Sequence, residues 1–363
     1  MTRVATVGEA LATLDVGRLD SPVEVGLAGA ELNTAVGLAR LGVPVSWSSR
    51  VADDAFGAQV RDALHREGID AQHVLSAPAE KTGLIVTSRL DEHTVRSEHY
   101  RSGSAASRLS PATVDPARQT RMLDGASLLH LTGITPALGD GPRALVGELV
   151  ALARTRGIAV SFDVNHRPQL VDADGMRAIV DEVIDAVDTL FCNEVEAELL
   201  TGENDPGLAL RALAARGPRV VVVKLGRRGA IALVDGLTLG TGVWPVPLPT
   251  FPVGAGDSFN AAWIALQLEG VGPAIALPLS AWVAAQVVAH PGDHEGFPAR
   301  VAFDAVLREL ESGTTRAPEL GGPADALGDA TVDGPTTRDV VDGHPAGGDA
   351  TVETITETEE VAR

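Results

Sequence analysis

Residues 189–202 have the sequence TLFCNEVEAELLTG, in which a short apolar run leads into a helical pattern. Residues 219–226, RVVVVKLG, then return to a second apolar run that is rich in valine. Short apolar runs of this kind, joined by a helix, are typical of parallel strands that are buried on both faces. The stretch therefore predicts a strand–helix–strand unit of an α/β protein.

The same alternation of strand and helix extends over most of the chain. Helical patterns that end at a glycine occur at 30–42, 55–68 and 144–157. The strand-like runs around them are RVATVG (3–8), VPVSWSSRV (43–51), SLLHLTG (127–133) and IAVSFDVN (158–165). We therefore expect an α/β fold in which a mainly parallel sheet has helices on both faces.

Two segments break this alternation and predict a separate small β-layer. Residues 80–101, EKTGLIVTSRLDEHTVRSEHYR, alternate polar and apolar side chains as a β-hairpin does. Residues 12–28, ATLDVGRLDSPVEVGLA, would add further strands to the same layer. Because a flap of this kind is able to close over the strand ends, we expect a lid that comprises about residues 10–30 and 80–105.

The composition changes at Gly313. From there to Arg363 the chain has 11 Asp and Glu against 3 Arg, and almost no large apolar side chains. A segment of this kind cannot bury enough surface to offset the entropy that is lost on ordering. We therefore expect one domain at residues 1–312, followed by a disordered acidic tail at residues 313–363 that serves either solubility or docking.

Composition and charge exclude several classes of function. The formal net charge of −20 argues against a general nucleic-acid-binding protein, because phosphate backbones need clustered cations. The single cysteine, Cys192, excludes an internal disulfide and fits a reducing cytosol. No apolar run is long enough to span a membrane, and the first residues lack the apolar segment of a secretion signal. We expect a cytoplasmic protein without nucleic-acid or membrane partners.

Residues 251–263, FPVGAGDSFNAAW, place a bare backbone and a carboxylate at the start of a predicted helix. The small residues Gly254, Ala255 and Gly256 let backbone N–H groups approach an anion, and the helix dipole favours negative charge there. Together they would form an anion hole for a phosphoryl group in transfer. Asp257 would repel that phosphate, so we expect it to accept a proton from the attacking hydroxyl instead. The alternative is that Asp257 only caps the helix.

Polar side chains also follow other predicted strands, where the ligands of open α/β sheets bind. Arg167 suits a bidentate grip on a carboxylate, and the alternative is a surface salt bridge. Asn193 and Glu196 offer oxygens that suit Mg²⁺ held largely through water, and the alternative is a helix cap. The helix at 30–42 has a candidate ligand loop or cap at its start, formed by Gly29, Ala30 and Asn33.

The run VVVVKLGRRGAIAL at 220–233 predicts a hairpin with Gly226 and Gly229 in its turn. Lys224, in this run, is one of the two lysines of the chain, and neither lysine follows a glycine. A Walker A loop requires a Gly-Lys-Ser/Thr sequence, so the chain does not belong to the P-loop enzymes.

With these segments in place, about residues 3–310 resemble the PfkB (ribokinase-like) family of carbohydrate kinases. GAGDSFNAAW (254–263) is similar to the second signature of the family, and AGAELNTAVGLARLGVPVSWSSRVADDAFG (28–57) is similar to the first. Within the family, the chain most resembles 2-keto-3-deoxygluconate kinases. That narrower resemblance depends on GEAL (8–11), AGAELN (28–33), HYRSGSAASRL (99–109), LHLTGITPAL (129–138) and FDVNHRPQL (162–170).

The resemblance implies a ribokinase-like three-layer α/β/α core with a mainly parallel sheet and a small β-sheet lid. Asp257 matches the catalytic base of the family, and the anion hole matches Gly254, Ala255 and Gly256. Gly29, Ala30 and Asn33 match sugar-contacting positions of the family, Tyr100 and Arg101 match its lid-side sugar contacts, and Arg167 matches the residue expected near the carboxylate of a sugar acid. Asn193 and Glu196 match an N-x-x-E pattern tied to Mg²⁺ and phosphate. The resemblance also implies that Lys224, Gly226 and Gly229 lie in the region that lines the nucleotide site. For Tyr100 and Arg101 the alternative is an exposed lid surface.

The sequence departs from the family at several positions. Phe251 and Pro252 stand where the family usually has Asp-Thr, whose oxygens help to bind a monovalent cation. Ala28 replaces one glycine of the first signature, and Ala52 stands where glycine is common. These changes leave the response to potassium and the level of activity open.

The leading hypothesis is that the protein uses ATP and Mg²⁺ to phosphorylate the primary hydroxyl of a sugar acid, with 2-keto-3-deoxygluconate, converted to its 6-phosphate, as the best match. One alternative is a PfkB-type kinase for a neutral sugar such as fructose or ribose. Another is a sugar-binding protein with impaired catalysis. An NAD-dependent oxidoreductase is disfavoured because no glycine fingerprint follows the first strand. The resemblance also suggests a homodimer or larger assembly through the lid.

Overall fold

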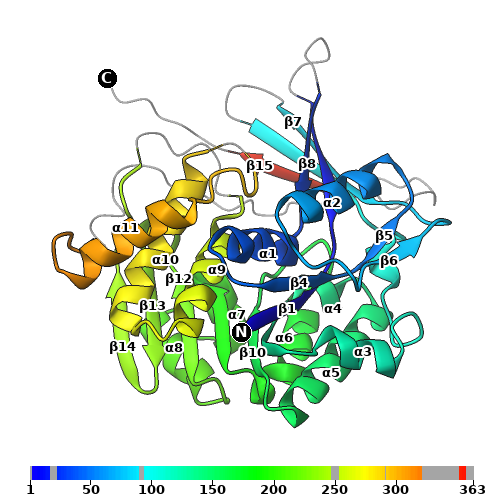
Figure 1. Cartoon of the computed structure of the whole chain (residues 1–363). Helices are drawn as coiled ribbons and strands as arrows, with labels where there is room; N and C mark the ends of the chain where they lie inside the picture. The colour runs from blue at the N-terminus through cyan, green and yellow to red at the C-terminus, as the bar shows by residue number, and fades with distance from the viewer. Residues whose placement is uncertain are drawn as a thin grey trace, which may run out of the picture.

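The computed structural model describes residues 2–16, 23–89, 94–246, 253–290, 292–320 and 351–356, and an eight-stranded sheet lies at its centre (Figure 1). Its strands are β1 (Arg3–Val7), β4 (Val45–Ser48), β9 (Ala126–Thr132), β10 (Ala159–Asp163), β11 (Thr189–Asn193), β12 (Val220–Lys224), β13 (Ala230–Val234) and β14 (Leu237–Thr241). Their order is β14-β13-β12-β11-β10-β9-β1-β4. The strands from β12 to β4 are parallel, and β13 and β14 extend the sheet as antiparallel strands.

Helices cover both faces of this sheet (Figure 1). Alternate residues of one strand belong to two separate cores, as Val220 and Val222 pack into one cluster and Val221 and Val223 into the other. The first cluster is closed by α1 (Ala30–Arg40), α2 (Ala55–Arg66), α9 (Ala255–Leu268), α10 (Pro273–Val288) and α11 (Arg300–Glu311). The second is closed by α3 (Pro116–Met122), α4 (Ile134–Ala137), α5 (Asp140–Thr155), α6 (Ala173–Val183), α7 (Glu194–Thr201) and α8 (Pro206–Ala214). The predicted three-layer α/β/α core is confirmed.

A second sheet projects from the core at the top of Figure 1. It contains β2 (Leu11–Val16), β3 (Glu24–Ala28), β7 (Gly83–Arg89), β8 (Thr94–Tyr100) and β15 (Thr351–Thr356). Its order is β15-β8-β7-β2-β3, with β7 and β8 forming an antiparallel hairpin as the alternation at 80–101 predicts. This is the small β-sheet that the sequence predicts beside the core. We call it the lid.

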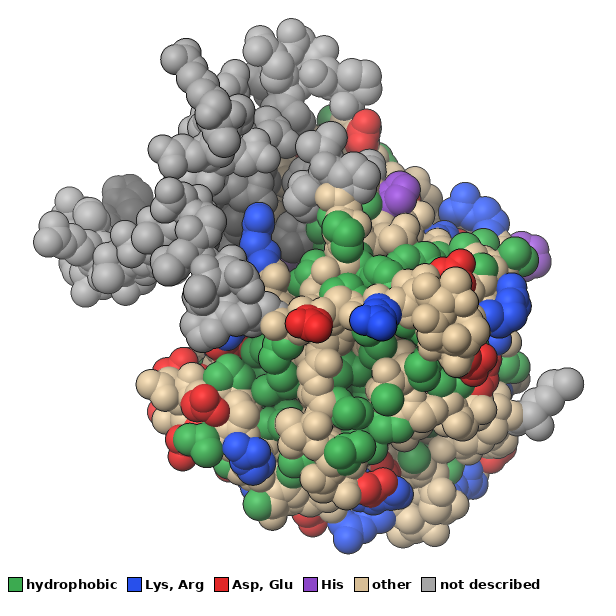
Figure 2. Space-filling view, turned by 90° about the vertical axis from the view of Figure 1, so that its left-hand side faces the viewer, with side chains coloured by type: hydrophobic (Ala, Val, Ile, Leu, Met, Phe, Trp, Pro, Cys, Tyr) green, Lys and Arg blue, Asp and Glu red, His purple; other side chains and the backbone are tan. Residues whose placement is uncertain are grey.

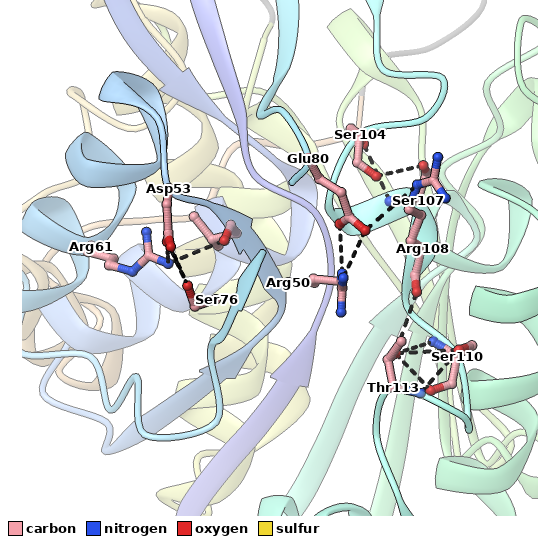
Figure 3. Close-up of polar contacts among 11 residues, drawn as sticks. Arg50, Asp53, Arg61, Ser76, Glu80, Ser104, Ser107, Arg108, Ser110 and Thr113 are labelled. Atoms are coloured by element: carbon pink, nitrogen blue, oxygen red, sulfur yellow. Dashed lines mark hydrogen bonds and ion pairs between the residues drawn. The ribbon is translucent and has the colours of Figure 1, made fainter. Parts of the chain in front are cut away.

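A carboxylate at the base of the lid connects the lid to the core (Figure 3). Glu80, just before β7, accepts from Arg50 Nε at 2.7 Å and from Arg50 Nη2 at 2.8 Å. Arg50 lies in β5 (Arg50–Ala52), which pairs with β6 (Leu75–Ala77) beside the core. Glu80 also lies 3.8 Å from Nε of Arg108, which follows β8. The carboxylate of Glu80, which precedes the β7–β8 hairpin, therefore contacts Arg50 of β5 and also Arg108, which follows the hairpin.

Two described parts of the tail that was predicted to be disordered make backbone hydrogen bonds with the rest of the protein. Gly242 N donates to Pro318 O at 2.8 Å, so residues 313–320 return to the edge of the core next to β14. Residues 351–356 pair with β8 as an antiparallel strand. An edge strand offers backbone hydrogen bonds that do not depend on apolar side chains, and composition therefore does not reveal this pairing. Residues 321–350 and 357–363 lie outside the described residues, and the prediction for them is unchanged.

The face that carries α11 and β14 has hydrophobic side chains gathered between isolated charged ones (Figure 2). The exposed hydrophobic side chains of the protein include Val301 on α11 and Leu237 on β14. Single exposed hydrophobic side chains are common on folded proteins, so we assign no function to this face. None of the helices in the described ranges has both the length and the apolar character needed to cross a membrane.

Candidate active site

Polar side chains gather where the parallel strands of the core sheet end. Asp163, Asn193 and Lys224 are the last residues of three neighbouring strands, β10, β11 and β12. The starts of α1 and α9 lie at the same edge of the sheet, because Glu31 of α1 accepts from Thr132 at the end of β9 and Asn260 of α9 donates to Asp163 at the end of β10. The carboxyl edge of an open parallel sheet is where such folds bind ligands.

Asp257 lies in the first turn of α9 and is 8% exposed. Asn33 Nδ2 donates to its Oδ2 at 2.9 Å, and Asn165 Nδ2 donates to its Oδ1 at 3.4 Å. Burial raises the pKa of Asp257 to about 6, while the hydrogen bond from Asn33 opposes that rise. The residue at the N-cap position is Gly254. Asp257 is therefore a buried carboxylate held by two amides, and the alternative that it only caps the helix is wrong.

The backbone that leads into α9 requires a glycine at position 254. It has a left-handed conformation with φ of 75°, and a Cβ at this position would lie 1.9 Å from the carbonyl oxygen of Asp293. The N–H groups of Ala255, Gly256 and Asp257 follow in the first helical turn, where a helix supplies no internal acceptors. The loop therefore brings backbone N–H groups without a side-chain cap to the start of α9. Phe251 and Pro252 lie outside the described residues.

Lys224 forms a buried polar cluster at the same edge of the sheet. Its Nζ donates to Asp163 Oδ2 at 2.8 Å and to Asn260 Oδ1 at 3.4 Å. Asn260 Nδ2 in turn donates to Asp163 Oδ2 at 2.6 Å. Burial alone would lower the pKa of Lys224, but the charges of Asp163 and Glu196 outweigh burial and raise it. The lysine is therefore a permanent positive charge inside the site.

Asn193 and Glu196 form a reciprocal cap at the start of α7. Asn193 Oδ1 accepts from Glu196 N, and Glu196 Oε2 accepts from Asn193 N, both at 2.8 Å. The other carboxylate oxygen of Glu196 accepts from His166 N at 2.8 Å. The capping alternative is thus observed, and each oxygen still has a second lone pair that can accept from a metal-bound water. Within the described ranges, no three His, Cys, Asp or Glu side chains are grouped so as to hold a metal ion.

Gly226 and Gly229 lie in the turn between β12 and β13. Both have positive φ, 57° and 106°. A Cβ on Gly229 would lie 1.9 Å from the carbonyl oxygen of Thr241, so this turn also brings two stretches of backbone close together. The two glycines lie between Lys224, at the end of β12, and the antiparallel strand β13.

Residues 1–300 match the family model described as pfkB family carbohydrate kinase. The chain belongs to the PfkB family of carbohydrate kinases. This PfkB chain is 34% identical over 288 residues to a 2-dehydro-3-deoxygluconokinase of Thermoproteus tenax, covering 78% of this chain and 86% of that one. It is also 34% identical over 312 residues to a 2-dehydro-3-deoxygluconokinase of Bacillus subtilis (strain 168), covering 83% and 94%.

A solved structure gives the same result for the fold. A putative ribokinase II from E. coli, in complex with ATP and Mg²⁺, superimposes with a TM-score of 0.77 at 26% identity, covering 85% of this chain and 100% of that one. The predicted family and the ribokinase-like fold are confirmed, and the protein is a carbohydrate kinase. A kinase of this family transfers a phosphoryl group from ATP to a sugar.

The two arginines predicted at the sugar site of this PfkB kinase lie in different surroundings. Arg101 is buried, and its Nη1 donates to Glu9 Oε1 at 2.7 Å. Arg167 is exposed on the loop after β10. Burial raises the pKa of Asp257, and the positive charge of Arg167 opposes that rise. Tyr100 is exposed on β8, and its hydroxyl donates to Glu98 Oε2 at 2.8 Å.

The connections between core and lid contain charged residues that the sequence analysis did not predict as site residues. Glu9 lies in the connection from β1 of the core to β2 of the lid, and Gly29 lies in the connection from β3 of the lid to α1 of the core. Gly29 has φ of 144°, and a Cβ there would lie 2.3 Å from the carbonyl oxygen of Glu9, so these two connections are in contact. Ala30 is buried beside it at the start of α1.

Glu31 is fully buried and accepts at Oε1 from the hydroxyls of Thr132, at 2.8 Å, and Thr135, at 2.7 Å. Burial raises the pKa of Glu31 to about 7.

Asp293 is a further acid at the site that the sequence analysis missed. It is half-buried in the loop after α10, and its backbone contacts Gly254 as described above. Burial, and then the charge of Asp257, raise the pKa of Asp293 to about 7. The local signal was an acid after a Gly residue in the segment PGDHEG at 291–296, which by itself is typical of any surface turn.

Proposed function

We propose that this kinase transfers the γ-phosphoryl group of ATP to the 6-hydroxyl of 2-keto-3-deoxygluconate. Two relatives at 34% identity have the name 2-dehydro-3-deoxygluconokinase, which refers to the same sugar acid. The observation that supports the chemistry is the buried Asp257 carboxylate in the first turn of α9, held by amides of Asn33 and Asn165.

Asp257 acts as the general base in this proposal. The sugar hydroxyl oxygen attacks the γ-phosphorus, the bond from that phosphorus to the β–γ bridging oxygen breaks, and ADP leaves with the bond's electron pair. The hydroxyl proton moves to Asp257. Because burial raises the pKa of Asp257 to about 6, its carboxylate is mostly ionised at neutral pH and is a stronger base than an exposed aspartate.

The first turn of α9 stabilises the charge that develops on the phosphoryl oxygens. Gly254, Ala255 and Gly256 leave the backbone N–H groups accessible, and the positive end of the helix dipole adds to them. Asn193 and Glu196 would hold Mg²⁺ through water, because their oxygens already accept backbone hydrogen bonds and retain further lone pairs. Bound Mg²⁺ would neutralise charge on the nucleotide phosphates. Lys224, Gly226 and Gly229 would line the nucleotide site.

The sugar acid would lie between Asp257 and the lid. Gly29, Ala30 and Asn33 would contact the sugar from the start of α1, and Tyr100 would contact it from the lid. Arg167 is the better placed of the two arginines to bind the carboxylate, because Arg101 already pairs with Glu9. Closure of the lid would exclude water from the phosphoryl group.

Copies of this protein would associate through the lid. β3 is an outer strand of the lid sheet, and its Val25 is 48% exposed. Outer strands with exposed apolar side chains favour pairing with another chain. Light scattering of the full chain would show a dimer or larger species, and a monomer at micromolar concentration would contradict this part of the proposal.

The test of the proposed function is an assay of ADP release on 2-keto-3-deoxygluconate, 2-keto-3-deoxygalactonate, fructose and ribose. We expect the highest kcat/KM on the first sugar acid. Asp257→Asn should still bind ligands and should lose turnover by roughly 10²- to 10⁴-fold, whereas Asp62→Asn on an exposed face of α2 should keep it.

Three results would change the assignment. Full turnover by Asp257→Asn would remove Asp257 as the base. A higher kcat/KM for fructose or ribose would favour a neutral-sugar kinase. A sugar that raises the melting temperature of the wild type without any ADP release would indicate a sugar-binding protein with impaired catalysis.

A further inference from the structure

Lys224 extends from the end of β12 to the first turn of α9. Its side chain passes over the ring of Phe191 in β11, with 5.9 Å between Nζ and the ring centroid, and reaches Asp163 at the end of β10. A Cβ on Gly256 would lie only 3.2 Å from this Nζ. The ammonium therefore lies against the backbone of the second residue of α9, next to the N–H groups proposed to receive the phosphoryl group.

The ammonium has a donor left for a ligand. A lysine has three N–H donors, and in the described part of the chain two of them have acceptors, Asp163 Oδ2 and Asn260 Oδ1. The side chain is 17% exposed, so it is sheltered from water yet open on one side. Asp163 and Asn260 are hydrogen-bonded to each other, which fixes the position of the ammonium.

The carboxylates around the start of α9 favour a protein cation at the proposed phosphoryl site. Asp163, Glu196 and Asp257 surround Lys224 closely enough for each to raise its pKa against the effect of burial. Carboxylates repel a phosphoryl group whose oxygens gain charge in the transition state. The backbone N–H groups carry only partial charge, whereas Lys224 places one full positive charge beside them.

We infer that Lys224 is a catalytic residue that donates a hydrogen bond to an oxygen of the transferring phosphoryl group, and that Asp163 and Asn260 are its positioning residues. The inference rests on the proposed function, since it takes the first turn of α9 to be the phosphoryl site. It also explains Gly256, because any larger residue there would press on the ammonium. The competing explanation is structural: Lys224 would only neutralise the buried Asp163.

A double variant separates the two explanations. Lys224→Met leaves Asp163 buried without its partner, so we expect a lower melting temperature as well as a loss of kcat. Lys224→Met combined with Asp163→Asn removes both charges and should recover most of the melting temperature. Loss of one preorganised donor typically lowers kcat about 10²- to 10³-fold, and we expect kcat of the double variant to stay that low while KM for the sugar changes little.

Recovery of wild-type kcat in the double variant would overturn the inference, because only a structural role predicts that outcome. Asp163→Asn alone should lower kcat less than Lys224→Met, since the lysine remains present but is held less firmly. An equal or greater loss from Asp163→Asn would also contradict it. If the wild type prefers a neutral sugar, the proposed substrate is wrong, and the same comparison is then made on that sugar with the same expected results.

Discussion

Asn33 Nδ2 donates a hydrogen bond to Asp257 Oδ2 at 2.9 Å, although the two residues are 224 positions apart in the chain. This contact joins the first turn of α1 to the first turn of α9. It positions the proposed base and also stabilises its ionised form, because an amide donor favours the charged carboxylate. The two signature segments of the family therefore meet at Asp257, whose backbone oxygen also accepts from Thr34 Oγ1 at 3.5 Å.

The first prediction is the pH dependence that this bond controls. Burial raises the pKa of Asp257 to about 6, so kcat/KM of the wild type should fall as the pH decreases through about 6. Asn33→Ala removes a donor that lowers this pKa, so the acid limb of the profile should move to higher pH. A pH–rate profile of both proteins measures the shift. An acid limb that moves to lower pH would contradict the assignment of Asp257 as the base.

The second prediction concerns the buried carboxyl group of Glu31. Burial raises its pKa from 4.5 to about 7, so the folded state binds its proton more tightly than the unfolded state does. The resulting stabilisation is fully present below about pH 4.5 and is lost as the pH rises through about 7. Glu31→Gln retains an acceptor for Thr132 and Thr135, and it should be more stable than the wild type at pH 8 by about 1 to 3 kcal/mol.

Urea unfolding of the wild type and Glu31→Gln at pH 5 and pH 8 measures this difference. The advantage of the variant should be present at pH 8 and should shrink at pH 5, where Glu31 itself is protonated. If the difference in free energy of unfolding between Glu31→Gln and the wild type were the same at pH 5 and pH 8, the pKa of Glu31 would not differ between the folded and unfolded states.

The third prediction compares two glycines that have the same backbone angle. Gly254 and Gly270 both have φ of 75°, but only at Gly254 would a Cβ collide with other backbone, at 1.9 Å from Asp293 O. Gly270→Ala should cost about 1 kcal/mol of stability and leave kcat unchanged. Gly254→Ala should cost more, and it should also lower kcat because the first turn of α9 moves. Melting temperature and kcat measured on both variants test this, and equal effects would refute it.

The fourth prediction separates the two arginines. Arg167→Met should raise KM for the sugar acid by roughly 10- to 100-fold and leave KM for neutral sugars unchanged, because it removes a charged donor to the carboxylate. Arg101→Met should lower the free energy of unfolding by about 3 kcal/mol or more, since it leaves Glu9 buried without a partner. Steady-state kinetics and urea unfolding give both quantities. A sugar-acid KM that depends on Arg101 and is independent of Arg167 would reverse the two assignments.

The fifth prediction concerns the base of the lid (Figure 3). Glu80→Gln removes the negative charge that holds Arg50 and Arg108, so it should cost about 1 kcal/mol and raise KM for the sugar as the hairpin loosens. Asp235→Asn, in the exposed bidentate pair with Arg219, is the matched control and should change neither quantity. A wild-type KM in Glu80→Gln would show that this contact does not position the lid.

Much of the architecture is encoded locally and was predictable from the chain. The apolar runs at 189–193 and 220–224 form strands because their side chains are buried on both faces, and the helix between them begins at a cap whose residues are only three positions apart. The small residues 254–256 predicted an exposed backbone at the start of α9, whereas the close approach of Gly254 to the carbonyl oxygen of Asp293 appeared only in the structure. The same local reasoning overstated the length of the tail without structure, since edge pairing depends on a distant strand.

The chain by itself determined the alternation of strands and helices, the glycine-lined start of α9 and the presence of Asp257 in its first turn. Only the tertiary structure decided which groups surround that carboxylate: Asn33, Asn165, Asp163 and Lys224, with Asp293 nearby. The physical reason is the separation in sequence between the residues that interact. Helix and strand periodicity arises from neighbours a few residues apart, whereas the pairing of Lys224 with Asp163 depends on the strand order β12-β11-β10, which no local pattern specifies.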